Sequence, residues 1–252
     1  MLLTNLETGI LTLTLNRPDK RNALSAPLLA ALSDGLDRAD LDREVRVIAI
    51  RGAGRDFCAG ADLEELLASA DKSVEENEQA ALVMGQVFLR MRQIPKPVVA
   101  VVQGRALAGG AGLATGCDLI VATESARFGY PEIQRGFVPA MVMTLLKRLV
   151  GEKVAFDLAA TGRLLTAHDA AGLGLISRVF PDADFETNVR EVLKGLASAS
   201  PTALAFTKKQ FYQLDGMGVE EGIRLGARVN ALSRATPDFR TAIAAFLKPE
   251  QK

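Results

Sequence analysis

Three short apolar runs constrain the fold of this chain more than any other feature. They cover residues 45–50 (VRVIAI), 98–102 (VVAVV) and 117–122 (CDLIVA). Strands that are apolar on both faces are typical of parallel sheets, which helices cover on both sides. Because helical stretches separate these runs, and a fourth run at 10–15 (ILTLTL) alternates as a strand does, the sequence predicts an α/β domain.

Helical patterns occur on both sides of the strand at 45–50. Leucine spacing predicts a helix over 27–41, and Asp62 is placed to cap a helix that starts with the residues DLEE. A further helix is expected from about residue 80 to Ile94. The polar stretch at 71–79 between them is expected to be a solvated, mobile segment.

From Pro139 onward the chain reads as almost entirely helical. The α/β part is expected to end near residue 195, and an apolar helical tail of the kind that forms oligomers follows it. The first of these helices is expected to start at Pro139 and to end at Gly151. The later ones are expected at 152–160, 167–173, 184–198, 201–213, 219–235 and 237–247.

Composition argues against several classes of protein. Among 252 residues, 30 Lys and Arg balance 30 Asp and Glu, so there is no basic excess to favour a nucleic-acid partner or an anionic membrane. Two cysteines and one histidine do not suit a disulfide framework or a zinc site, and no metal is expected. Without a signal-peptide pattern or an apolar run near ~20 residues, we expect a cytoplasmic protein with no membrane partner.

Two glycine-rich bends could bring backbone N–H groups to one point. The bend at 103–113 (QGRALAGGAGL) lacks the lysine of a phosphate loop, but it offers unhindered amides near a helix N-terminus. The bend at 51–62 (RGAGRDFCAGAD) has the same character. Together they could form an oxyanion hole. Each could also serve only tight packing, and Asp62 is more typical of a helix cap than of a catalytic group.

A third segment, 128–139 (FGYPEIQRGFVP), places Glu132 in a loop with proline and glycine on either side. In this order, the three segments resemble the crotonase superfamily, the enoyl-CoA hydratase/isomerase family. The resemblance covers nearly the whole chain, and its matching segments are 15–24 (LNRPDKRNAL), 59–65 (AGADLEE), 104–118, 128–133 (FGYPEI), 161–163 (TGR) and 171–176 (AGLGLI).

The resemblance implies a crotonase-like spiral of ββα repeats over residues 1–195 and a helical C-terminal trimerisation region over 196–252. It implies a homo-trimer or a dimer of trimers. The substrates it implies are acyl thioesters of coenzyme A, so coenzyme A belongs to the substrate and no separate cofactor is expected.

The resemblance also assigns site residues. The oxyanion amides are those of Ala61 and Gly109, and Glu132 matches the second of the two hydratase glutamates. Lys20 or Arg21 is a candidate partner for a coenzyme A phosphate. The expected coenzyme A contacts are Lys20, Arg21, Ala23, Ala61, Asp62, Leu63 and Glu64.

The chain departs from the two-glutamate pattern at Gly112, where the hydratases carry their first glutamate. Residues 140–142 (AMV) also replace a run that is often small and glycine-rich. Hydration needs one group for water and one for a proton, whereas one base can shift a double bond. The sequence therefore favours isomerisation narrowly over hydration, with Glu132 as the single acid/base.

Three alternatives stay open. Another group could hold the water of a true hydratase, or the protein could bind acyl-CoA without turnover. Gly112 could instead make room for a bulky acyl group. The candidate liners of such an acyl pocket, which could equally be ordinary core, are Met84, Phe88, Gly112, Phe137 and Met141.

Overall fold

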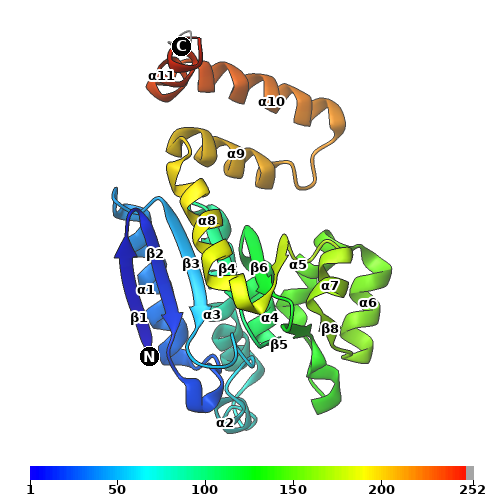
Figure 1. Cartoon of the computed structure of the whole chain (residues 1–252). Coiled ribbons are helices and arrows are strands. Elements are labelled where there is room, and N and C mark those ends of the chain that lie inside the picture. Colours follow the sequence, from blue (N-terminus) through cyan, green and yellow to red (C-terminus); the bar gives the residue numbers. More distant parts are fainter. Residues whose placement is uncertain (248–252) are drawn as a thin grey trace.

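A six-stranded sheet forms the centre of the computed structural model, which describes residues 1–247 (Figure 1). The first two strands form an antiparallel hairpin, and the other neighbours in the sheet are parallel. In spatial order the strands are β1 (Leu2–Glu7), β2 (Ile10–Leu15), β3 (Val47–Gly52), β4 (Val98–Val102), β6 (Leu119–Thr123) and β9 (Arg178–Phe180). The predicted α/β class and its four strands are confirmed; β1 and β9 were not predicted.

A second, three-stranded sheet contains β5 (Arg105–Leu107), β7 (Arg127–Gly129) and β8 (Leu165–Thr166). Strand β5 follows β4 after two residues, and α4 (Gly109–Gly116) follows β5, which gives one strand–strand–helix unit of the predicted repeat. Strands β5 and β7 are parallel, so the segments that leave their carboxyl ends come from the same edge of this sheet.

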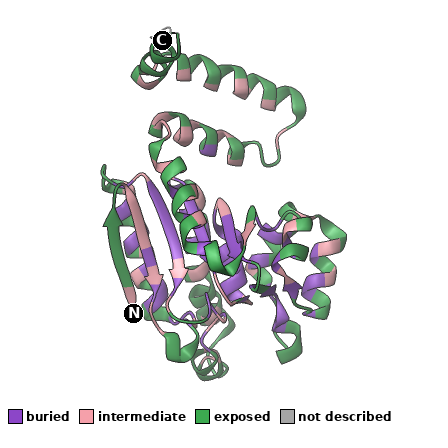
Figure 2. Cartoon of the chain, viewed as in Figure 1, coloured by how far each residue is buried: buried purple, intermediate pink, exposed green. Residues whose placement is uncertain are grey.

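Helices cover both faces of the large sheet, as its apolar strands predict. Helix α8 (Phe185–Ser198) packs Phe185 and Val189 on one face, against valines of β3, β4 and β6. Helices α1 (Ala26–Leu41), α3 (Val74–Gln93) and α4 contribute to the core on the other face. Figure 2 shows the central strands as buried, whereas the edge strand β1 and much of the outer helices are exposed.

Helix α3 corrects one expectation from the sequence. The stretch at 71–79 does not interrupt the helix, because α3 begins at Val74. The Ser73 hydroxyl accepts from the Glu76 N–H at 3.1 Å, and the Glu76 carboxylate accepts from the Ser73 N–H at 2.9 Å. This reciprocal cap fixes the start of the helix, and its polar side chains face the solvent. The short helix α2 (Leu63–Ala68) precedes it, with Asp62 as the predicted N-cap.

The remaining helices follow the predicted pattern. Three short 3₁₀ turns are η1 (Pro18–Lys20), η2 (Pro131–Arg135) and η3 (Asp182–Asp184). The other helices are α5 (Ala140–Val150), α6 (Glu152–Thr161), α7 (Ala167–Gly172), α9 (Pro201–Gln213), α10 (Val219–Arg234) and α11 (Pro237–Phe246). Among residues 1–247, none of the helices combines the length and the apolar character needed to cross a membrane.

The C-terminal helices stand apart from the sheet (Figure 1). Helix α8 runs across residue 195, so the predicted boundary there falls inside a helix. Neither α10 nor α11 buries a residue, and both expose apolar side chains such as Ile223, Phe239 and Ile243. Residues 248–252, which end the predicted helical region, lie outside the described residues.

Helix α9 is attached to the core through the buried side chain of Lys208. Its ammonium donates to the carbonyl oxygens of Met91 at 2.7 Å and Lys96 at 2.9 Å, and to the Asp118 carboxylate at 2.6 Å. The Tyr212 hydroxyl donates to the same carboxylate at 2.6 Å. Burial lowers the pKa of Lys208, and the nearby Asp118 opposes that shift. The ion pair therefore holds the C-terminal helices to the start of β6.

Replacing Lys208 by Met is expected to lower the free energy of unfolding by roughly 3 kcal/mol, because it leaves a largely buried carboxylate without its cation. Urea unfolding followed by circular dichroism measures the difference. Lys209→Met, at the exposed neighbouring position, is the matched control and should be close to neutral. Equal unfolding midpoints for the two variants would contradict the expectation.

Candidate active site

The segment that contains Ala61 lies between two other strands of backbone. On one side, Cys58 bridges to Ala106 of β5, and on the other, Ala61 bridges to Leu24. The Leu24 N–H donates to the Gly60 carbonyl at 2.8 Å, and the Asp62 N–H donates to the Leu24 carbonyl at 3.0 Å. Successive N–H groups of an extended strand point in opposite directions, so the Ala61 N–H is directed away from Leu24.

The Gly109 amide lies beside this segment. Gly109 is the first residue of α4, where N–H groups have no partner within the helix and the helix dipole favours negative charge. A carbon added at the Cβ position of Gly109 would lie 3.6 Å from the Ala61 nitrogen, and one added at Gly60 would lie 3.3 Å from the Gly109 nitrogen. Within residues 1–247, neither the Ala61 nor the Gly109 N–H donates a hydrogen bond. Two such neighbouring donors can bind one oxygen on which negative charge develops.

The backbone at Ala108, just before Gly109, is strained. Its φ of 51° and ψ of −127° lie in a region that residues with a side chain rarely adopt. The Ala108 N–H donates to the Gly129 carbonyl of β7 at 2.8 Å, which holds the turn in place. Strain of this kind costs about 1–3 kcal/mol and is concentrated at functional sites. Here it sets the direction of the Gly109 amide.

Close approach of the two bends also depends on Gly110. A carbon added at its Cβ position would lie 2.3 Å from the Cys58 carbonyl oxygen. Only a residue without a side chain fits there. The glycine at position 110 therefore allows α4 to begin in direct contact with the bend at 51–62. Cys58 itself is buried, and burial raises the pKa of its thiol to about 12, so it behaves as a small apolar residue.

Glu132 comes from the same edge of the small sheet as Gly109. Leu107 of β5 pairs with Gly129 of β7, and the chain continues from these residues to Gly109 and to Glu132, respectively. The turn η2 carries Glu132, and the Tyr130 hydroxyl just before it lies 2.9 Å from the Thr115 hydroxyl of α4. The parallel pairing thus brings the predicted carboxylate to the end of the sheet at which α4 begins.

The Glu132 carboxyl group is buried and partly unpaired. The residue is 7% exposed, and its Oε2 atom has no hydrogen-bond partner among the described residues. Burial raises its pKa above the usual range, while its own backbone N–H and the Arg135 charge oppose that shift. A carboxyl group with a raised pKa and a free oxygen is suited to take up and release a proton.

Four of the predicted coenzyme A residues, Lys20, Arg21, Leu63 and Glu64, are exposed, whereas Asp62 is buried. The Lys20 ammonium donates to the Glu64 carboxylate at 2.5 Å, which raises the pKa of Lys20. Both side chains are exposed, and such a pair is weak enough for Lys20 to exchange Glu64 for another anion. Arg21, with a φ of 49°, and Leu63 are also exposed.

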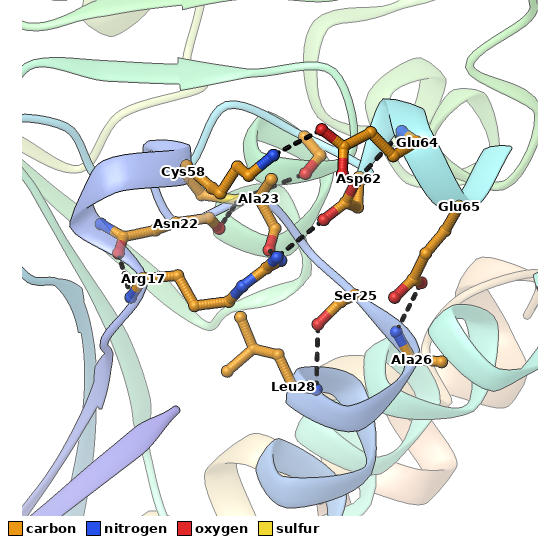
Figure 3. A network of polar contacts seen from close by, with 12 residues as sticks. Arg17, Asn22, Ala23, Ser25, Ala26, Leu28, Cys58, Asp62, Glu64 and Glu65 are labelled. Atoms are coloured by element: carbon orange, nitrogen blue, oxygen red, sulfur yellow. Dashed lines mark hydrogen bonds and ion pairs between the residues drawn. The ribbon is translucent and has the colours of Figure 1, made fainter. Parts of the chain in front are cut away.

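Ala23 and Asp62 are joined by Arg17, which the sequence did not single out (Figure 3). The guanidinium donates to the Ala23 carbonyl at 2.6 Å and to the Asp62 carboxylate at 2.8 Å. Asp62 also accepts from the Glu64 N–H at 3.1 Å as the cap of α2. The turn at residues 16–19 is visible in the sequence, but the partners of Arg17 lie too far along the chain for a local pattern to show them.

The candidate acyl liners differ in where they lie. The sulfur of Met84 would be 3.3 Å from a carbon added at Gly109, so Met84 lies beside this glycine. The sulfur of Met141 would lie at the same distance from a carbon added at Gly85 of α3. Phe88 is buried, whereas Phe137, whose N–H donates to the Glu132 carbonyl at 3.1 Å, is half exposed.

Gly112 does not open a space for a substrate. A carbon added at its Cβ position would lie 2.4 Å from Cγ2 of Val142 and 3.2 Å from the end of the Phe88 ring. These side chains come from α5 and α3 and fill the volume in which a side chain at position 112 would begin. The space next to the Gly112 Cα is therefore already filled by protein side chains. The expectation that Gly112 makes room there for a bulky acyl group is wrong.

No group of three or more His, Cys, Asp or Glu side chains in residues 1–247 is arranged to hold a metal ion.

Comparison with known proteins gives consistent matches over nearly the whole chain. A family model described as "Enoyl-CoA hydratase/isomerase" matches residues 5–251. A Thermus thermophilus protein named as a candidate enoyl-CoA hydratase is 43% identical over 93% of this chain and 92% of its own length. The 2,3-dehydroadipyl-CoA hydratase of Escherichia coli is 36% identical over 98% of this chain and 95% of its own. The crystal structure of a Mycobacterium smegmatis enoyl-CoA hydratase matches with a TM-score of 0.93 and 35% identity, over 98% of this chain and 95% of that one.

Proposed function

The chain belongs to the enoyl-CoA hydratase/isomerase family of the crotonase superfamily, and we propose that it moves the double bond of a 3-enoyl-CoA to the 2-position with Glu132 as its single acid and base. As a member of this family it is an enzyme that acts on acyl-CoA thioesters. The choice of isomerisation, the role of Glu132 and the two oxyanion amides are the parts that we propose.

The proposed reaction needs one base and one anion site. The Glu132 carboxylate removes a proton from C2 of the 3-enoyl thioester, and the electron pair moves to the thioester oxygen to give a dienolate. The N–H groups of Ala61 and Gly109 donate to that oxygen, and each such donor typically contributes ~10²–10³ in rate. The protonated Glu132 then returns the proton to C4, which leaves the double bond between C2 and C3.

The observation that carries this proposal is the apolar filling at Gly112. Where a second carboxylate would begin, Val142 and Phe88 occupy the volume, and Glu132 keeps a buried oxygen without a partner. Water activation by a side chain at position 112 is therefore absent. A single carboxylate serves proton transfer between two carbons of one substrate, but hydration divides its tasks between two groups.

Other carboxylates near these segments already have roles. Glu64 pairs with a lysine, and Glu65 accepts from the N–H at the start of α1 at 2.8 Å. Asp118 lies beyond the opposite end of α4 and is bonded to the lysine and the tyrosine of α9. Glu124 is exposed. These contacts support Glu132 as the single acid/base.

Hydration of a 2-enoyl-CoA is the second candidate, and the names of the relatives favour it. The Escherichia coli relative is a hydratase by name, and the matching Mycobacterium smegmatis structure is that of a protein named enoyl-CoA hydratase. In this chain, hydration would need a water held by a group other than residue 112. It would then use Glu132 for the proton and the same two amides for the enolate.

We propose that the chemistry needs no cofactor beyond the coenzyme A of the substrate, and that the chain forms a homo-trimer or a dimer of trimers. The exposed apolar side chains of α10 and α11 support an oligomer, since surface of this kind is commonly buried between subunits. Light scattering that gives a monomer at micromolar concentration would contradict the assembly.

The proposed role of Glu132 predicts a shifted pH dependence. The base must be ionised, and burial raises its pKa, so kcat/KM for a 3-enoyl-CoA should fall on the acid side with an apparent pKa above 4.5, the ordinary glutamate value. The rate should increase as pH rises through that pKa and then level off. Initial rates between pH 4 and pH 8 measure it, and an acid limb at or below 4.5 would be inconsistent with Glu132 as the base.

One pair of assays distinguishes isomerisation from hydration. A 2-enoyl-CoA and a 3-enoyl-CoA are offered separately, and the ultraviolet absorbance of the conjugated enoyl thioester is followed. Isomerisation predicts a gain of absorbance from the 3-enoyl-CoA. Loss of absorbance from the 2-enoyl-CoA alone would establish hydration instead. No change with either, together with retained binding, would favour a protein that binds acyl-CoA without turnover.

A further inference from the structure

Arg17 connects the two backbone segments that flank the Ala61 amide. The residue lies in the connection between β2 and α1, and its side chain is largely buried. Nη1 donates to the Ala23 carbonyl at 2.6 Å, and Nη2 donates to the Asp62 carboxylate at 2.8 Å (Figure 3). One planar group thus holds two residues that are 39 positions apart in the sequence.

These two residues are the immediate neighbours of the bridge that directs the Ala61 N–H. Ala23 precedes Leu24, and Asp62 follows Ala61, while Leu24 and Ala61 form the bridge itself. The bridge has two hydrogen bonds, from the Leu24 N–H and from the Asp62 N–H, and next to it the Ala59 N–H donates to the Arg21 carbonyl at 3.0 Å. Arg17 adds a side-chain hydrogen bond to the residue on each side of this short pairing, Ala23 and Asp62, and these contacts favour its register.

Arg17 is itself fixed at its backbone. Its N–H donates to Asn22 Oδ1 at 2.9 Å, and its carbonyl accepts from the Asn22 N–H at 2.8 Å. The side-chain amide of Asn22, which is fully buried, donates to the carbonyls of Ala53 at 2.9 Å and Asp56 at 2.8 Å. The backbone of Arg17 is therefore anchored, through Asn22, to the segment that follows β3.

The contact with Asp62 is charge-assisted. The hydrogen bond from Arg17 lowers the pKa of the Asp62 carboxyl group, so this group stays ionised at neutral pH. Asp62 is buried and caps α2 with its other oxygen, which accepts from the Glu64 N–H at 3.1 Å. Without Arg17, the Asp62 carboxylate would be left buried without its cation. Its negative charge would then lie next to the Ala61 N–H, which is proposed to donate to a negatively charged oxygen.

We propose that Arg17 is a positioning residue for the oxyanion amide of Ala61, which it holds in register with Gly109 by bridging Ala23 and Asp62. The inference rests on the proposed function, because it assumes that the Ala61 N–H donates to a thioester oxygen. Arg17 touches no reacting atom. It acts through the backbone, and a displacement of about 1 Å at such a donor can cost ~10²-fold in rate.

The test follows the thioester carbonyl directly. A saturated acyl-CoA with a ¹³C-labelled carbonyl binds without double-bond chemistry, and its infrared stretching frequency falls when two N–H groups donate to the oxygen. Arg17→Ala should lose most of this shift and lower kcat for a 3-enoyl-CoA by roughly 10²-fold, with a smaller change in KM. Arg17→Lys should recover part of both, because an ammonium lacks the planar fork that serves both acceptors together.

Arg51→Ala is the matched control. Arg51 also makes a two-pronged contact with a carboxylate, that of Glu186, but on the face of the sheet that α8 covers. Its loss should leave the carbonyl frequency and kcat within about twofold of the wild-type values. Thermal melting reports any loss of stability in each variant, and if Arg17→Ala does not fold, Arg17→Lys carries the comparison.

Two results would overturn the proposal in distinguishable ways. If the wild-type protein shifts the carbonyl frequency and Arg17→Ala shifts it equally, with only KM raised, Arg17 shapes the coenzyme A surface and does not position the amide. If the wild-type protein binds the thioester without any shift, the oxyanion site itself is absent and the proposed function fails with it.

Discussion

Glu132→Gln is expected to lower double-bond transfer from a 3-enoyl-CoA by about 10²–10⁴-fold, the usual contribution of a positioned acid or base. The amide keeps the size and the place of the carboxyl group but cannot accept the C2 proton. Binding of a saturated acyl-CoA should change little, because the amides of Ala61 and Gly109 are untouched. Stopped-flow absorbance gives the rate, and calorimetry gives the affinity.

Glu124→Gln is the control for this variant. Glu124 is an exposed carboxylate just after β6, and its replacement should leave turnover within about twofold. A Glu132→Gln variant that retains full turnover on each enoyl-CoA tested would remove Glu132 from the reaction.

Glu132→Gln is also expected to raise stability at neutral pH. Burial raises the pKa of the native carboxyl group, so ionising it costs more in the folded than in the unfolded chain. Well below pH 4.5 both states are protonated and the difference should vanish; it should grow as pH rises through that value. A gain in stability that accompanies the loss of activity would separate a catalytic role from simple misfolding.

The second large expected effect is a gain in hydration activity. It requires substitutions at Gly112 and Val142 in the same variant. Gly112→Glu alone places its Cβ 2.4 Å from Val142 Cγ2 and should destabilise the fold by about 1–3 kcal/mol. Val142→Gly removes that side chain and leaves a volume beside α4. In the double variant the new glutamate occupies this volume, so we expect the two changes to be less costly together than the sum of each alone.

The double variant should also gain activity. With a second carboxylate available to activate water, hydration of a 2-enoyl-CoA is expected to rise by roughly 10²–10⁴-fold over the wild-type protein. Met143→Gly, at an exposed position of α5, controls for the cost of glycine in the helix, about 1 kcal/mol. If the wild-type protein already hydrates as fast as the double variant, the filling at Gly112 does not decide the reaction.

The centre of the large sheet could be predicted from the sequence because β3 and β4 are buried on both faces. A short apolar run rich in β-branched residues, such as 98–102, is typical of these strands, and Val98–Val102 is a strand. Short strands such as β5 and β7, of three residues each, leave no pattern of this length. The start of α3 was missed because its first turns carry polar side chains, although Ser73 and Glu76 have the spacing of a capping box.

The candidate site was predictable where one local segment determines it, and not where distant segments meet. Glu132, Ala61 and Gly109 lie in bends that a sequence pattern marks. The filling of Gly112 depends on Val142 and Phe88, which belong to other helices, so a glycine that suggests space in the sequence is in fact covered. Arg17 was missed for the same reason, because both of its acceptors are brought to it only by the fold.

The most direct test of the central claim is a crystal structure of the protein with a bound, unreactive acyl-CoA. The thioester oxygen should lie about 2.7–3.1 Å from the nitrogens of both Ala61 and Gly109, with the Glu132 carboxyl group facing C2 of the acyl chain. A thioester oxygen that contacts neither nitrogen, or a Glu132 side chain directed away from the acyl chain, would contradict the claim that these two amides and this one carboxylate perform the reaction.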